Sequence, residues 1–295
     1  MKSKKENMII IRIGGGLGNQ LFQYALGRNL SLTKNIPLRL DLSWFKTNLD
    51  REYKLKYFNT REIIATDSEL KKIKRYQKIN SGRYFLHNLL FSNESIYIEE
   101  KQFHFNSKVL DIKDIAYLIG YWQTEKYFEN IKDIIRKDFT LKNEPSGFYK
   151  NDEQEIREKN SVSLHIRRGD YITNGIANAN MGVCSLEYYK KAVNIIKDSV
   201  NNPTFFIFSD DIDWATENLQ IDSPAVFVSD KKLKDYEELI LMSKCKHNII
   251  ANSSFSWWGA WLNNSPDKIV IAPKKWFNDT KRNSKDIIPN NWIKV

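Results

Sequence analysis

Two adjacent arginines, Arg167 and Arg168, follow the apolar run that ends in His165 and Ile166. A guanidinium is a rigid, permanently charged fork of N–H donors, which suits the oxygens of a phosphate or diphosphate. A surface pair bridged to Asp170 is the alternative interpretation. We favour an anion site because open α/β sheets bind their ligands just beyond the carboxyl ends of the strands.

A serine-rich turn lies further along the chain, where residues 249–261 read Ile-Ile-Ala-Asn-Ser-Ser-Phe-Ser-Trp-Trp-Gly-Ala-Trp. Ser253, Ser254 and Ser256 offer hydroxyls, and the start of a helix adds amide donors that attract phosphate. Helix capping by Asn252 or Ser253 alone would explain one polar residue but not four. The tryptophans are expected to pack in the core.

A glycine-rich segment precedes the first predicted helix, as Gly-Gly-Gly-Leu-Gly-Asn-Gln at residues 14–20. The candidate site residues here are Gly15, Gly16, Gly18, Asn19 and Gln20. Glycines allow close backbone approach to a ligand, but a tight turn alone would use them equally well. The segment is neither a GxGxxG dinucleotide motif nor a phosphate loop with its lysine.

Three aspartates, Asp210, Asp211 and Asp213, follow the apolar residues 204–208. An Asp-x-Asp pair resembles the divalent-cation site of metal-dependent glycosyltransferases. Two arginines and a serine turn would already neutralise a diphosphate. We therefore expect these aspartates to grip a nucleotide or cap the next helix, and we expect no metal and no cofactor.

Alternating apolar runs predict an α/β fold with parallel strands. Residues 8–13, 37–42 and 115–121 read as strands, with helices near 21–30 and 127–139, and the polar residues 142–160 as a linker. Five strands then alternate with helices, which is typical of a Rossmann-like domain. The strands are expected at 161–167, 204–208, 225–228, 249–251 and 268–272, and the domains at 1–155 and 156–295.

The composition argues against a membrane-spanning, secreted or nucleic-acid-binding protein. The chain has 295 residues, 41% of them hydrophobic, and no run reaches the ~18 apolar residues of a membrane span. No secretory signal is evident, so we expect a cytoplasmic protein. The net charge of +10 fits a weak attraction to anionic membrane, but no motif supports nucleic-acid binding. Cys184 and Cys245 fit no zinc or disulfide pattern.

Six ordered blocks resemble the bacterial α-1,2-fucosyltransferase family over nearly the whole chain. The blocks are residues 15–24, 120–123, 165–171, 182–189, 208–211 and 252–259. The resemblance implies a GT-B-like architecture, with two Rossmann-like domains facing a cleft. It also implies inverting, metal-independent transfer of fucose from GDP-β-L-fucose to the 2-hydroxyl of a galactose. The acceptor would belong to a surface glycan or lipid-linked oligosaccharide assembled at the inner face of the cytoplasmic membrane.

The resemblance also implies roles for individual residues. Arg167 and Arg168 would bind the diphosphate, His165 and Asp210 would lie near guanine, and the serines would bind phosphate oxygens. The glycine segment would help to form the acceptor side.

The catalytic base is less defined. Asp170 is our candidate for the base or for orienting the acceptor, with a salt bridge to Arg168 as its alternative role, and Glu187 is the next candidate. Two other functions stay open: a metal-dependent enzyme using another nucleotide sugar, or a non-catalytic protein that binds nucleotide or nucleic acid.

Overall fold

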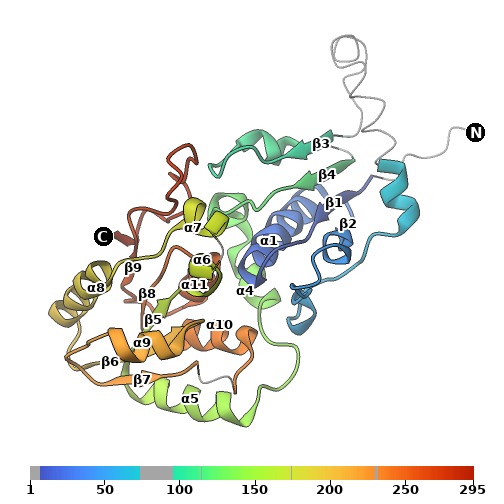
Figure 1. The fold of residues 1–295 in the computed structure, drawn as a ribbon. Coiled ribbons are helices and arrows are strands. Elements are labelled where there is room, and N and C mark those ends of the chain that lie inside the picture. Colours follow the sequence, from blue (N-terminus) through green and yellow to red (C-terminus); the bar gives the residue numbers. More distant parts are fainter. Residues whose placement is uncertain (1–6, 74–95, 114, 174, 230–231) are drawn as a thin grey trace, which may run out of the picture. The chain divides into compact units, whose positions relative to one another are not determined.

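The computed structural model describes residues 7–73, 96–113, 115–173, 175–229 and 232–295. The chain forms two compact α/β units, one of residues 1–139 with 285–287 and one of residues 140–284 with 288–295 (Figure 1). The sequence predicts a domain boundary after residue 155, whereas these units divide between Phe139 and Thr140. Among the described residues, no helix has the length and apolarity needed to cross a membrane.

The first unit is built on a parallel sheet of four strands in the order β2-β1-β4-β3. The strands are β1 (Ile9–Arg12), β2 (Leu38–Asp41), β3 (Ile96–Glu99) and β4 (Ala116–Ile119). Ile9, Ile10 and Ile11 are fully buried, as expected for a β-branched run in a parallel sheet covered on both faces. The helix α1 (Leu17–Lys34) connects β1 to β2 and lies against β1 (Figure 1).

The helix expected over residues 127–139 is shorter in the structure. Two 3₁₀ turns at Glu125–Tyr127 and Glu129–Ile131 come first, and α4 (Lys132–Asp138) follows. Further 3₁₀ turns lie at Ser43–Lys46, Leu55–Tyr57 and Ser107–Asp111.

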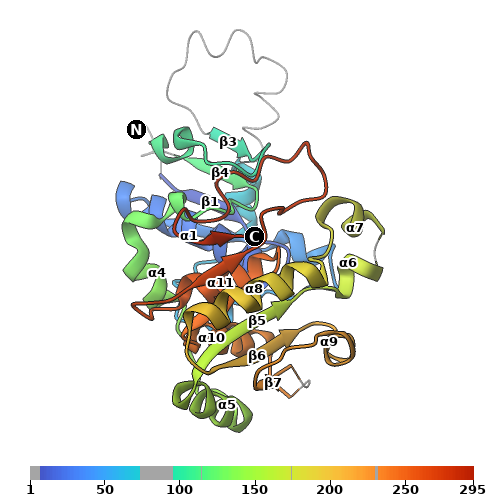
Figure 2. The same ribbon diagram turned by 90° about the vertical axis from the view of Figure 1, so that its left-hand side faces the viewer.

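The second unit contains a parallel sheet of six strands in the order β10-β9-β8-β5-β6-β7. These are β5 (Asn160–Ile166), β6 (Pro203–Ser209), β7 (Ala225–Phe227), β8 (His247–Ile249), β9 (Val270–Ala272) and β10 (Ile293–Lys294). The five strands expected from the sequence are present, with β8 two residues earlier than expected, and β10 adds one at the edge beside β9. Figure 2 shows β5, β6 and β7 side by side.

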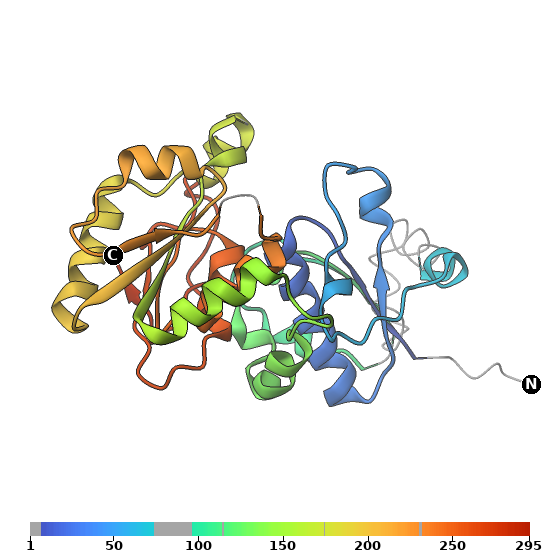
Figure 3. The same cartoon turned by 90° about the horizontal axis from the view of Figure 1, so that it is seen from below.

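Helices cover both faces of this second sheet. They are α5 (Gly147–Glu158), α8 (Leu186–Ser199), α9 (Ile212–Asn218), α10 (Asp235–Lys244) and α11 (Ser254–Leu262), with α6 (Gly169–Thr173) and α7 (Gly175–Met181) after β5. In Figure 3 the strands run between α8 and α9 on one side and α5 on the other. Val162, Leu164 and Ile166 share a buried cluster with α8, which confirms the predicted alternation along β5.

The predicted linker over residues 142–160 is wrong, because most of it is the helix α5. Ser146 caps this helix by accepting a hydrogen bond from the Tyr149 N–H at 3.3 Å, and Glu237 accepts one from the Ser146 N–H at 2.7 Å. Tyr149 and Ile156 are buried, and the helix packs on α10. The polar composition therefore marks the exposed face of an amphipathic helix.

A buried polar network fixes α4 to α1 in the first unit. The Asp138 carboxylate accepts hydrogen bonds from the Tyr24 hydroxyl at 2.7 Å and from the Arg28 guanidinium at 2.9 Å. The Arg28 and Asp138 side chains are 9% and 10% exposed. Leaving either charge without its partner in this environment would be costly.

We predict that Asp138→Ala lowers the free energy of unfolding by about 3–5 kcal/mol, because it leaves the Arg28 charge buried and unpaired. Asp133→Ala is the control on the same helix, since Asp133 is 87% exposed in its pair with Arg136. It should change stability by less than about 0.5 kcal/mol. Urea unfolding followed by circular dichroism measures both, and equal effects of the two changes would contradict the prediction.

Candidate functional site

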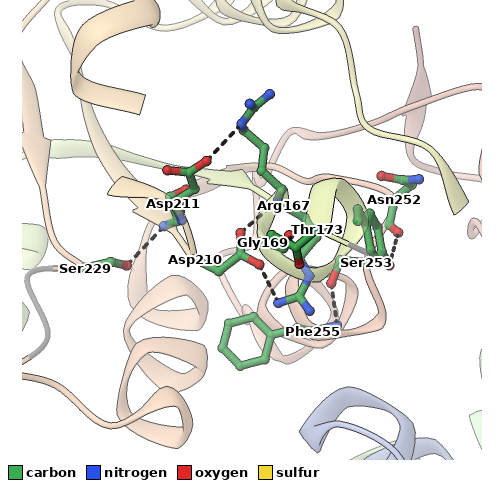
Figure 4. Close-up of polar contacts among 12 residues, drawn as sticks. Arg167, Gly169, Thr173, Asp210, Asp211, Ser229, Asn252, Ser253 and Phe255 are labelled. Carbon is green, nitrogen blue, oxygen red and sulfur yellow. Dashed lines mark hydrogen bonds and ion pairs between the residues drawn. The ribbon is translucent and has the colours of Figure 1, made fainter. Parts of the chain in front are cut away.

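The two arginines after β5 are held by aspartates after β6. Parallel pairing sets Ile166 beside Ser209, so the residues that follow each strand meet at one edge of the sheet. Arg167 Nη1 lies 2.9 Å from Asp210 Oδ2, and Arg168 Nε lies 3.2 Å from Asp211 Oδ2 (Figure 4). The Arg168 guanidinium also lies 3.7 Å from the centre of the Trp214 ring, a cation–π contact.

Asp210 joins the two arginine segments. Its Oδ1 accepts a hydrogen bond from the Arg168 N–H at 2.8 Å, while its Oδ2 pairs with Arg167. A methyl group at Gly169 would lie 2.5 Å from Asp210 Oδ2, so only glycine allows this close approach. The turn between β5 and α6 is thus built around the Asp210 carboxylate.

The arginines are partly exposed, with 23% of the Arg167 and 19% of the Arg168 side chain accessible. A guanidinium carries five N–H donors, so a single carboxylate does not preclude binding of an anion. Arg168 pairs with Asp211, and the alternative pair with Asp170 stays a prediction. The structure describes Asp170 as part of α6 without its side chain.

His165 is buried beside the same edge, with 3% of its surface exposed. Its ring lies 5.6 Å from the Phe255 ring, centre to centre, and within the described structure its Nδ1 has no hydrogen-bond partner. Burial lowers the pKa of His165 to about 3, and the Arg167 charge adds to this shift. The imidazole is therefore neutral near pH 7 and can accept a hydrogen bond from a ligand.

The serine turn forms the start of α11. The Ser253 side chain caps the helix by accepting a hydrogen bond from the Phe255 N–H at 3.3 Å (Figure 4), and Ser254 is the first helical residue. Ser256 is buried, and its hydroxyl donates to the Ser253 carbonyl at 3.4 Å. All three serines therefore lie in the first turn of the helix, but the Ser256 hydroxyl is buried and bonded to the backbone.

Asn252 braces the turn instead of capping the helix. Its amide donates to the carbonyls of Met181, Gly182 and Trp276 at 2.9–3.1 Å. The segment before α8 contains α6 and α7, and the bonds to Met181 and Gly182 tie it to the serine turn. Trp257, Trp258 and Trp261 are buried, which confirms that the tryptophans of α11 belong to the core.

The two aspartates of the Asp-x-Asp pair after β6 lie in different environments. Asp211 caps α9 by accepting a hydrogen bond from the Trp214 N–H at 3.4 Å, and Asp213 is exposed in the first turn of that helix. Across the described ranges, no group of three or more His, Cys, Asp or Glu side chains is arranged to hold a metal ion. The capping role considered for these aspartates is the one observed for Asp211.

The glycine segment is a tight turn in the first unit. Gly15 has a φ of 77°, and a Cβ there would lie 2.8 Å from the Asn19 amide nitrogen. The Gln20 amide donates to the carbonyls of Gly15 and Glu52, and the Asn19 oxygen accepts from the Gln123 amide at 2.7 Å. These bonds brace the turn, while Gly16 stands at the start of α1 without a side-chain cap.

Two carboxylates differ sharply in environment. Glu187, the second candidate base, is exposed in the first turn of α8 and pairs with Lys191 at 2.7 Å, which lowers its pKa. Glu100 follows β3 and lines a cavity in the first unit. Burial raises the pKa of Glu100 to about 7, against the opposing effect of hydrogen bonds from the Tyr121 and Trp122 N–H groups.

Glu100 is not among the site residues predicted from the sequence, because no strand is predicted at residues 96–99. The block Gly120–Gln123 is part of the family resemblance, but the sequence does not indicate that its backbone N–H groups bind Glu100. A β-branched run ending in two glutamates, Ile96-Tyr97-Ile98-Glu99-Glu100, was the available signal.

Comparisons with known proteins agree over the full length of the chain. The sequence profile of Glycosyl transferase family 11 matches residues 1–295. The Escherichia coli O-antigen biosynthesis glycosyltransferase WbnK is 38% identical over 96% of this chain and 99% of its own. An Escherichia coli alpha-1,2-colitosyltransferase is 35% identical over 98% of this chain and 99% of its own.

The fold also agrees with a solved structure. A mutant of Arabidopsis thaliana FUT1 in complex with GDP matches with a TM-score of 0.53 and 11% identity, over 92% of this chain and 71% of that one. This likeness and the two parallel-sheet units confirm the GT-B-like α/β fold class. On the match of the whole sequence, the chain is a glycosyltransferase that belongs to Glycosyl transferase family 11.

Proposed function

We propose that this glycosyltransferase moves L-fucose from GDP-β-L-fucose to the 2-hydroxyl of a galactose in a surface glycan, with inversion at the sugar. The observation that carries the donor site is the pair of arginines fixed by Asp210 and Asp211 at the carboxyl edge of the second sheet. The resemblance of the chain to α-1,2-fucosyltransferases supports fucose as the transferred sugar.

The charges suggest how the donor would react. Arg167 and Arg168 would contact the diphosphate and stabilise the negative charge that grows on GDP as its bond to the sugar breaks. The amides at the start of α11, with Ser253 and Ser254, would add hydrogen bonds to phosphate oxygens. Two fixed cations and a helix N-terminus would serve in place of a metal ion.

Guanine recognition is assigned to His165 and Asp210. The neutral imidazole of His165 would accept or donate one hydrogen bond at the base. Asp210 orients Arg167 and the Arg168 backbone in the structure, and a carboxylate retains lone pairs beyond two bonds. Those lone pairs would face the N1–H and the amino group of guanine.

The acceptor would be a glycan or a lipid-linked oligosaccharide at the cytoplasmic face of the membrane. The net charge of +10 supports a weak attraction to anionic lipid. Colitose is a second candidate for the transferred sugar. One relative that aligns over nearly its whole length with this chain is named an alpha-1,2-colitosyltransferase.

A donor assay tests the proposed reaction. The enzyme is offered GDP-fucose or GDP-colitose with a galactoside, with and without EDTA, and the product linkage is read by NMR. We expect an α-1,2-fucoside and little effect of EDTA. Preferred use of GDP-colitose would refute the fucose assignment. Loss of turnover in EDTA, restored by Mn²⁺ or Mg²⁺, would refute the metal-free mechanism.

We predict that Arg167→Ala reduces kcat about 10²–10³-fold, as removal of one preorganised donor to developing charge does elsewhere. Arg167→Lys should not restore the rate, because an ammonium cannot provide the planar fork. Arg157→Ala is the control, since Arg157 is 66% exposed on α5. Steady-state kinetics give kcat for the three variants. A normal kcat in Arg167→Lys would exclude a bidentate phosphate contact.

Asp170 remains our proposed proton acceptor. Asp170→Asn should lower kcat about 10²–10⁴-fold with unchanged affinity for GDP, because the amide keeps the shape but takes no proton. Asp198→Asn on the exposed part of α8 is the matched control. If kcat is retained, Asp170 is not the base. If GDP affinity falls with the rate, the residue belongs to the donor site.

A further inference from the structure

We propose that the cavity beside Glu100, at the carboxyl edge of the first sheet, binds a neutral sugar ring of the acceptor. In this subsite Glu100 accepts a hydrogen bond from one of the sugar hydroxyls. The inference rests on the proposed transfer to a galactoside, but the cavity lies wholly within the first unit.

The cavity opens where β1, β3 and β4 end. Its volume is about 210 Å³, which is below the ~300–1,000 Å³ of sites for drug-sized ligands. The side chains that matter here are Arg12, Trp44, Glu99, Glu100, Lys101 and Tyr121. A space of this size suits one sugar ring better than a whole nucleotide.

Glu100 is held rigidly on the cavity wall. Its Oε2 accepts from the Tyr121 N–H at 2.6 Å, and both of its oxygens lie 3.1 Å from the Trp122 N–H. A Cβ at Gly120 would overlap the Glu100 side chain, and Trp122 has a φ of 58°. Backbone strain of this kind at a cavity is common where a functional group must be positioned.

The charge around Glu100 is balanced. Arg12 and Lys101 line the cavity together with Glu99 and Glu100, so two cations face two acids. A phosphate group would meet the repulsion of Glu99 and of the ionised fraction of Glu100, whereas a neutral polyol can donate hydroxyl hydrogens to the glutamates and accept from the cations. Burial opposes the charge of Glu100 and raises its pKa to about 7, and hydroxyl donors would favour the charged form.

Aromatic rings complete the site. Tyr121 is 39% exposed and stacks on Phe103, with ring centres 6.2 Å apart and planes at 11°. Trp44 lies against Gly14, where a Cβ would come within 2.7 Å of its ring. Flat rings beside hydrogen-bonding groups suit a sugar, which has apolar C–H faces and a polar edge.

Glu100→Gln and Tyr121→Ala test the subsite, with Glu129→Gln as the matched control because Glu129 is exposed in the same unit. Three quantities are measured on the full-length enzyme, with GDP bound for the NMR titration, GDP-fucose as donor for KM, and the nucleotide-free enzyme for GDP binding. These are the affinity for methyl β-D-galactoside by NMR titration, KM for the same acceptor, and the dissociation constant of GDP. We expect about 10- to 100-fold weaker galactoside binding and a matching rise in KM for Glu100→Gln. Tyr121→Ala should weaken binding in the same direction, and GDP affinity should not change.

The outcomes distinguish failure of the proposed sugar subsite from failure of the proposed use of GDP-fucose. Unchanged galactoside affinity in both variants would overturn the subsite, and so would a parallel loss of GDP affinity and thermal stability, which would make Glu100 a loop brace only. A wild-type enzyme that binds the galactoside but does not use GDP-fucose would refute the donor assignment and leave the subsite standing.

Discussion

The ion pair between Arg167 and Asp210 depends on one constraint, the parallel pairing of β5 with β6. Because Ile166 lies beside Ser209, each strand delivers its charged residues to the same edge of the sheet. The missing side chain of Gly169 lets the turn close around Asp210. The start of α11 reaches this edge because β8 pairs with β5 on the other side. The candidate donor site is therefore a consequence of strand order, and the charges would not meet in another register.

Buried Asn and Gln side chains hold several of the turns near the ends of the strands in place. In the second unit Asn252 binds three carbonyls around the serine turn, and Asn248 donates to Ser163 and the Met242 carbonyl between β8 and its neighbours. In the first unit Gln23 accepts from the Gly14 N–H and donates to the Gly120 carbonyl, which ties the turns after β1 and β4 together. Buried amides can satisfy several backbone groups at once, so these turns are rigid without regular secondary structure.

Burial shifts two titratable groups in opposite directions, one in each unit. It lowers the pKa of His165 to about 3 and raises that of Glu100 to about 7, because in both cases it disfavours the charged form. Each group lies at the carboxyl edge of its own sheet. Perturbed pKa values cluster at functional sites, and both groups carry proposed roles, His165 toward the donor and Glu100 toward the acceptor.

The sequence by itself determined the α/β class, five of the six strands of the second sheet and the residues at their ends, because β-branched runs and helical periodicity are local properties. It also limited the candidate donor residues to a few short blocks. Only the tertiary structure decided which aspartate pairs with which arginine, that Ser256 is buried and that residues 147–158 form a helix on α10. It alone brought Glu100 against the backbone of Tyr121 and Trp122, about twenty residues further along the chain. Those contacts depend on strand order and long-range packing, which residue spacing does not encode.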